Sequence, residues 1–157
     1  MMSFDLEQNI GILPAERQTR LRAHLRNLEN NVLSKTKLTE AQKQEFRDVI
    51  AEHDFCNEAR NFYHLKSHEY YAEAKKYKEL YEQPGISEKQ AKEYLAKFQQ
   101  AKKNMDDCAA KNKHYADRVA VLTPARTRVM QMADDDLRRQ YEEKTKGNKN
   151  PDNPFRK

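Results

Sequence analysis

The sequence predicts an all-α fold: a long antiparallel helical hairpin, packed as a coiled coil, with short N- and C-terminal helices at its open end as a three- or four-helix bundle. Apolar residues keep an alternating spacing of three and four through residues 39–122, and only Pro84-Gly85 interrupts this pattern. Of the 157 residues, 37% are hydrophobic and 35% are charged. This composition suits helices with narrow apolar stripes and disfavours a β-sandwich or a doubly wound sheet.

The outgoing helix of the hairpin is predicted over residues 39–82. Its start, Thr39-Glu40-Ala41-Gln42, has the capping-box pattern, in which the Thr hydroxyl and the Gln side chain satisfy free helix amides. Such a helix would be on the order of 65 Å long, so part of it should protrude from a compact domain. Its apolar stripe consists of Phe46, Val49, His53, Cys56, Arg60, Tyr63, Ser67, Tyr70, Ala74, Tyr77 and Tyr81.

The return helix is predicted over residues 88–122. Pro84 removes an amide and Gly85 accepts a positive φ, and a second capping box follows at Ser87-Glu88-Lys89-Gln90. Its stripe consists of Ala91, Tyr94, Phe98, Ala101, Met105, Cys108, Asn112, Tyr115, Val119 and Leu122.

Folding the chain at the turn brings together stripe residues whose numbers sum to about 171. Most of the resulting layers place a bulky residue opposite a small one, which favours interdigitated packing. Arg60 and Asn112 form the one strongly polar layer. We interpret this pair as setting the register, since buried polar groups penalise slipped pairings, and a functional pocket there is the alternative.

Two flanking helices are predicted from proline positions and leucine spacing. Pro14 suits a first helical turn and precedes a helix over residues 14–33. Thr123-Pro124 suits an N-cap and first position, which predicts a separate helix over residues 124–144. A second apolar stripe exists only at the open end of the hairpin, so both helices are expected to dock there.

These elements form one helical domain over residues 1–144. Residues 70–100 should project from it as a two-helix arm. Residues 145–157 are rich in Lys, Asn, Gly and Pro, which predicts a disordered polar tail.

No motif typical of catalysis is present, and we predict no enzyme, no cofactor and no metal. The three glycines are isolated, so they form no phosphate-binding loop. The best metal candidate is His64 with His68, four residues apart on one helix face near Glu69. Two ligands make a weak site, so we interpret them as solvated. Cys56 and Cys108 fall on stripe positions in different layers, where reduced thiols act as small hydrophobes.

Tyrosine is concentrated in the hairpin, where most of the rings fall on the apolar stripe. Tyr71 lies off the stripe, so its ring is expected at the surface of the arm. Together with Lys75 and Lys78 it forms a predicted partner-binding surface.

Arginine is absent between Asn61 and Asp117, where every basic residue is Lys or His, and most arginines belong to the segments expected at the bundled end. An Arg guanidinium suits bidentate contacts with carboxylate or phosphate. These side chains either pair with local acids, which is the ordinary case, or face an anionic partner. The candidate anion- or partner-binding residues are Arg17, Arg20, Arg22, Arg26, Arg126 and Arg128.

The tail contains Asn153-Pro154-Phe155, which resembles the short motif that EH domains bind in endocytic adaptors. In that motif Asn and Pro set a turn and Phe fills a pocket. The resemblance covers three residues and implies an EH-domain partner in a eukaryotic setting, with chance occurrence as the alternative. In outline the hairpin is also similar to the export-apparatus stalk proteins of flagellar and type III secretion systems, a likeness of shape and charge.

Localisation is predicted from the absence of membrane and export signals. No apolar run approaches the roughly 20 residues that a bilayer-spanning helix needs. The first ten residues carry Asp5 and Glu7 and no cationic segment. We expect a soluble chain that is cytoplasmic, or a secreted effector without a cleavable signal.

The predicted function is a non-catalytic protein–protein interaction module: a scaffold, adaptor or secretion-associated factor that presents the hairpin to another protein. The alternative is a nucleic-acid-binding protein that uses the Arg-rich end, although a net charge of +5 from 30 basic and 25 acidic residues favours this only weakly. A homodimer is a further alternative, because the apolar stripe can be buried within one chain or by the exchange of hairpins between two chains.

Overall fold

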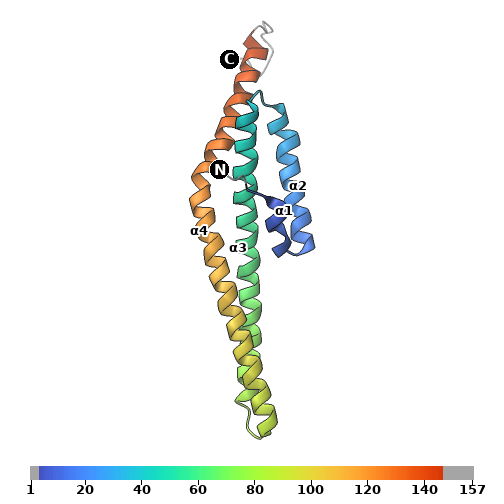
Figure 1. Ribbon diagram of the computed structural model, residues 1–157, viewed down its shortest axis with the longest axis vertical. Helices are drawn as coiled ribbons and strands as arrows, with labels where there is room; N and C mark the ends of the chain where they lie inside the picture. The colour runs from blue at the N-terminus through green and yellow to red at the C-terminus, as the bar shows by residue number, and fades with distance from the viewer. Residues whose placement is uncertain (1–3, 147–157) are drawn as a thin grey trace.

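A computed structural model describes residues 4–146, and this part of the chain contains helices and no strand. Two long helices pack as an antiparallel hairpin, with short helices beside its open end (Figure 1). The all-α hairpin predicted from the sequence is confirmed. The elements are α1 Leu6–Asn9, the 3₁₀ turn η1 Ile10–Ile12, α2 Ala15–Asn31, the 3₁₀ turn η2 Leu33–Lys35, α3 Glu40–Tyr81 and α4 Glu88–Lys146.

Both predicted capping boxes are present, and they explain where the long helices begin. At the start of α3, Oγ1 of Thr39 accepts from the Gln42 amide (3.1 Å), and the Gln42 side chain accepts from the Thr39 amide (2.9 Å). Ser87 and Gln90 repeat this arrangement at the start of α4. Between the helices, Gly85 has a φ of +80°, which a residue with a Cβ rarely adopts.

The observed register agrees with the predicted one. The rings of Tyr77 and Tyr94, a predicted layer, lie 6.4 Å apart between centroids. Asn112 donates from Nδ2 to the backbone carbonyl of Arg60 (2.9 Å), so this layer also forms. The Arg60 guanidinium, however, bonds to Asn57 and not to Asn112. The polar contact that marks the register is therefore between a side chain and the backbone.

One boundary prediction is wrong, because α4 continues through Pro124 and no separate helix begins there. Thr123, expected as an N-cap, donates its hydroxyl to the Val119 carbonyl four residues earlier (2.7 Å). A proline inside a helix costs about 3 kcal/mol. Burial of Val129 and Ala133 against α3, both with no exposed surface, offsets this cost.

Pro124 bends α4 and does not break it. Figure 1 shows α4 changing direction in its orange stretch, as helices do at proline. The helix extends to Lys146, two residues beyond the end predicted at residue 144. Residues 147–157, which include Asn153-Pro154-Phe155 and most of the predicted tail, lie outside the described part of the chain.

Replacing Pro124 with Ala should raise the free energy of unfolding by about 2 kcal/mol, because the proline costs about 3 kcal/mol inside the helix and its removal gives the unfolded chain more freedom, worth about 1 kcal/mol. The new amide can donate to the carbonyl of Ala120, and the ring no longer crowds the preceding turn. Urea unfolding followed by circular dichroism measures the change. A loss of stability would mean that the bend is needed for the packing of Val129 and Ala133.

Two core clusters hold the open end together. The first joins the N-terminal elements to both long helices, and its buried residues are Ile10, Leu13, Leu21, Phe55, Cys56, Ala59, Val119 and Leu122. The second packs the α2–α3 connection against α4, and its buried residues are Leu33, Leu38, Phe46, Ile50, Val129 and Ala133. The predicted bundle at the open end thus consists of α1, α2, α3 and the second half of α4.

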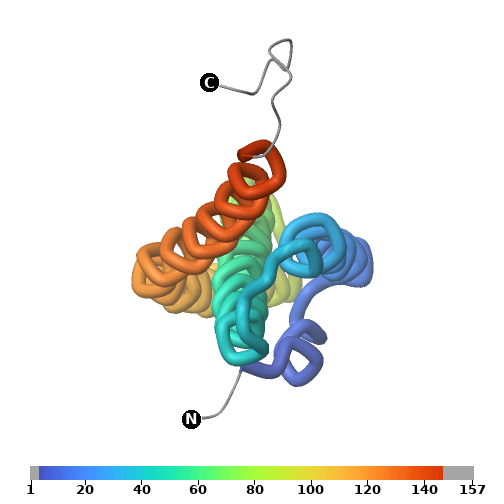
Figure 2. Tube along the Cα trace, turned by 90° about the horizontal axis from the view of Figure 1, so that it is seen from above, coloured from blue at the N-terminus to red at the C-terminus, as the bar shows by residue number. Residues whose placement is uncertain are grey.

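The molecule divides into a thick end and a thin arm. Figure 1 and Figure 2 place α3 between α2 and α4, and α1 and α2 lie only along the half of α3 nearer its start. From Leu65 to the turn, only α3 and α4 pack on each other, and Ala74 and Ala101 are the buried residues of this two-helix arm. Within residues 4–146, no helix has the length and apolar character needed to cross a bilayer.

Candidate functional site

The three arm residues singled out from the sequence lie together in the structure. Tyr71 and two lysines of α3 face a groove that α4 completes, with a volume of about 350 Å³. Buried Ala74 forms part of its floor, and Tyr71 is 58% exposed at its edge. The residues that line it are Tyr71, Ala74, Lys75, Lys78, Phe98, Lys102 and Met105. We call this set the arm groove.

The walls of the arm groove are cationic. The described residues that line it include Lys75, Lys78 and Lys102 and no acidic side chain. None of the three ammonium groups forms an ion pair within residues 4–146, whereas Lys66 and Lys97 elsewhere on the arm pair with Glu69 and Glu93. The groove therefore combines an apolar floor with unneutralised positive charge.

Sequence reasoning found the α3 side of the arm groove and missed the α4 side. Phe98 and Met105 were assigned to the stripe, where both are half-buried, and their outer edges also reach the groove. Lys102 was not singled out. The predicted register could have placed Lys102 at this surface. It sets Ala74 opposite Phe98, so Lys102, one turn after Phe98, lies near the lysines of α3.

Most of the predicted Arg site is engaged in ion pairs within the chain. Arg17 pairs with Glu58 (3.0 Å), Arg22 with Glu7, Arg126 with Asp54 (2.9 Å) and Arg128 with Glu45 (2.9 Å). Arg20 and Arg26 form no ion pair within residues 4–146. The six residues thus contribute mainly to contacts between helices, and they do not converge on one shared groove.

A buried carboxylate that was not predicted from the sequence, Asp54, lies where α2, α3 and α4 meet. Asp54 is 9% exposed, and it bonds to His24 of α2 (2.7 Å), to its neighbour His53 (2.8 Å) and to Arg126 of α4 (2.9 Å). Burial acts to raise the pKa of this carboxyl, but the hydrogen bonds from Arg126, His53 and His24 outweigh it and hold the pKa below its ordinary value. A cavity of about 410 Å³ lies beside this cluster.

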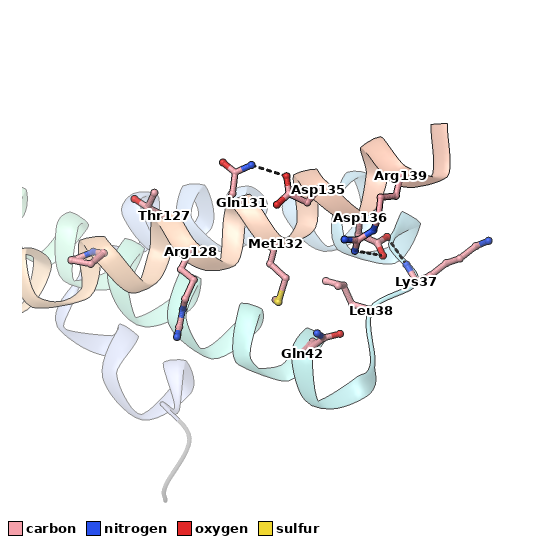
Figure 3. Close-up of a pocket in the computed structure, with 11 residues that line it drawn as sticks. Lys37, Leu38, Gln42, Thr127, Arg128, Gln131, Met132, Asp135, Asp136 and Arg139 are labelled. Carbon is pink, nitrogen blue, oxygen red and sulfur yellow. Dashed lines mark hydrogen bonds and ion pairs between the residues drawn. The ribbon is translucent and has the colours of Figure 1, made fainter. Parts of the chain in front are cut away.

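A cleft of about 820 Å³ lies between the start of α3 and the second half of α4 (Figure 3). Its floor includes Leu38 and Met132, and its rim carries charges of both signs. Asp136 accepts from the Lys37 amide (2.9 Å) and from the Gln140 side chain (2.7 Å). These bonds lower the pKa of Asp136, the Lys37 amide being the main cause, and they tie the α2–α3 connection to α4.

The histidine pair and the two cysteines show no sign of a metal site or a reactive thiol in the part of the chain described. The Nε2 atoms of His64 and His68 lie 3.2 Å apart on exposed side chains. The residues described include no group of three or more His, Cys, Asp or Glu placed to hold a metal ion. Both cysteines are free, and burial raises the pKa of the Cys56 thiol to about 11, which disfavours the reactive thiolate.

No protein-family profile matches this sequence, and the comparisons with curated proteins and with solved structures find no match.

Proposed function

We propose that this chain is a non-catalytic protein–protein interaction module, acting as a scaffold, adaptor or secretion-associated factor, and that it binds its partner through the arm groove. The observation that carries the proposal is the convergence of exposed Tyr71 and three unpaired lysines around an apolar floor. Aromatic rings and long cationic side chains beside an apolar floor are the groups that anchor protein interfaces.

The arm is favoured over the bundled end because its charges are available. At the bundled end, Arg126 and Asp54 already neutralise each other, as do Arg17 and Glu58. An anionic partner would have to break such pairs before it could bind. On the arm the ammonium groups of Lys75 and Lys78 need no such rearrangement.

The double variant Lys75→Glu/Lys78→Glu should lose partner binding by about ten-fold or more, because two attractive contacts at the groove become repulsive. Tyr71→Ala should weaken binding as well, since its exposed ring offers an aromatic anchor. The measurement is capture of partners by the full-length chain from cells that express it, followed by titration of the purified partner. Circular dichroism checks that each variant remains helical.

The matched control is Lys89→Glu/Lys103→Glu, which makes the same change of charge at exposed arm positions away from the groove. This variant should bind like the wild-type chain. If both double variants lost the same amount of affinity, the loss would be explained by net charge and not by the groove. If both kept the wild-type affinity, the proposal would be overturned.

The alternative, nucleic-acid binding through the Arg-rich end, depends on Arg20 and Arg26, which have no ion pair in the part of the chain described. Binding to duplex DNA or RNA that falls steeply with salt, and that Lys75→Glu/Lys78→Glu leaves unchanged, would favour it.

A further inference from the structure

We infer that the occupant of the arm groove is an acidic amphipathic α-helix of another protein, which packs along α3 and α4 and converts the arm into a three-helix bundle. This inference depends on the proposed function, because it names the class of partner for the same surface. Its basis is the shape, the charge and the backbone chemistry of the groove.

The shape fits a helix. Tyr71 and Lys78 lie two helical turns apart on α3, which corresponds to about 10 Å along the axis. Residues of the occupant at positions i, i+3 or i+4, and i+7 cover this length on one helix face. Between the walls, Ala74 has no bulk beyond Cβ, so an apolar side chain of the occupant can approach it closely while contacting Phe98 and Met105.

Backbone chemistry disfavours an extended segment. A bound strand satisfies its amides and carbonyls by pairing with the edge of a sheet, and residues 4–146 contain no strand. Against the apolar floor, the inward-facing backbone groups of an extended peptide would lose water without gaining partners. A helix satisfies these groups internally.

The charges select an acidic occupant. Lys75 and Lys78 stand on the α3 wall and Lys102 on the α4 wall, so acidic residues on both flanks of the bound helix would meet ammonium groups. The same arrangement opposes self-association through this face, because a second copy would bring its own three lysines against these three. A homodimer through the arm groove is therefore disfavoured.

The test uses the full-length chain and three fluorescent synthetic peptides of equal length. The first has leucines at helical spacing flanked by Glu, the second replaces every Glu with Lys, and the third keeps the composition of the first with the leucine spacing destroyed. Fluorescence anisotropy should show the first peptide binding about ten-fold more tightly than either other peptide. Its helix content should rise on binding, measured by circular dichroism.

Binding of the first peptide should weaken about ten-fold with Lys75→Glu/Lys78→Glu and stay within about two-fold with Lys89→Glu/Lys103→Glu. Equal binding of the first and third peptides would overturn the inference in favour of a site that recognises charge alone. If the chain bound vesicles of anionic lipid, or single-stranded nucleic acid, more tightly than the first peptide, the inference would be overturned, and the arm groove would be assigned to that ligand.

Failure of the inference and failure of the proposed function are distinguishable. If the captured cellular partner depends on Lys75 and Lys78 while the acidic peptide does not bind, the inference is wrong and the arm groove remains the proposed site. If neither the partner nor the peptide depends on these lysines, both are wrong.

Discussion

Replacing Phe46 with Ala is expected to lower the free energy of unfolding by about 3–5 kcal/mol. The Phe46 ring is 2% exposed in the cluster that also contains Val129 and Ala133 of α4 and Leu33 of the α2–α3 connection. Truncation removes the transfer free energy of the ring and leaves a cavity among side chains from three segments. The measurement is urea unfolding of the full-length chain, monitored by circular dichroism.

This substitution also tests why α4 continues past Pro124. If packing on Phe46 holds the second half of α4 in place, amides between about Val129 and Lys146 should exchange with deuterium faster in Phe46→Ala, while amides of the arm stay unchanged. Leu65→Ala is the control: Leu65 is 50% exposed on the same helix, so its truncation should cost no more than about 0.5 kcal/mol. Uniformly faster exchange would contradict a local role for Phe46.

Replacing Asp54 with Ala is expected to lower the free energy of unfolding by about 2–3 kcal/mol. The substitution leaves Arg126 and His24 without the carboxylate that joins α4 to α2. The estimate is below that for a fully buried ion pair, because the side chains of Arg126 and His24 are 29% and 47% exposed and can regain water. Asp106→Ala, at an exposed position of α4, serves as the control and should change stability little.

The Asp54 carboxylate also predicts a pH dependence with a definite sign. Its folded pKa is lowered, so the folded protein binds fewer protons at this site than the unfolded chain does. The contribution of this carboxylate to the free energy of unfolding is complete above its unfolded pKa of about 3.9, and it is lost as the pH falls through the folded pKa. Acid titration should therefore destabilise the wild-type chain more steeply than Asp54→Asn. Parallel acid curves would contradict this assignment.

Local rules in the sequence were sufficient for the hairpin. The spacing of three and four predicted the hairpin and part of its buried face, although Ile50 is buried outside the predicted stripe and Tyr81 within it is 42% exposed. The capping boxes at Thr39 and Ser87 predicted where the long helices begin. Pro124 was misjudged for a physical reason. Its helix-breaking cost is a local property, whereas the burial that outweighs it comes from Val129 and Ala133 packing on α3.

The candidate sites also differ in whether local spacing in the sequence is sufficient to predict them. Tyr71, Lys75 and Lys78 lie within two turns of one helix, so their common face could be predicted from spacing alone. Asp54 could not be found in this way, because its partners His24 and Arg126 are 30 and 72 residues distant in the sequence. A buried charge is recognisable only when the helices that supply its partners have been placed.

Lysine footprinting of the full-length chain, free and bound to its captured partner, tests the central claim most directly. The account predicts that acetylation of Lys75, Lys78 and Lys102 falls on binding, while Lys89 and Lys103, exposed on the same arm, react as before. Unchanged reactivity of the three groove lysines in the complex would contradict the assignment of the arm groove as the partner site.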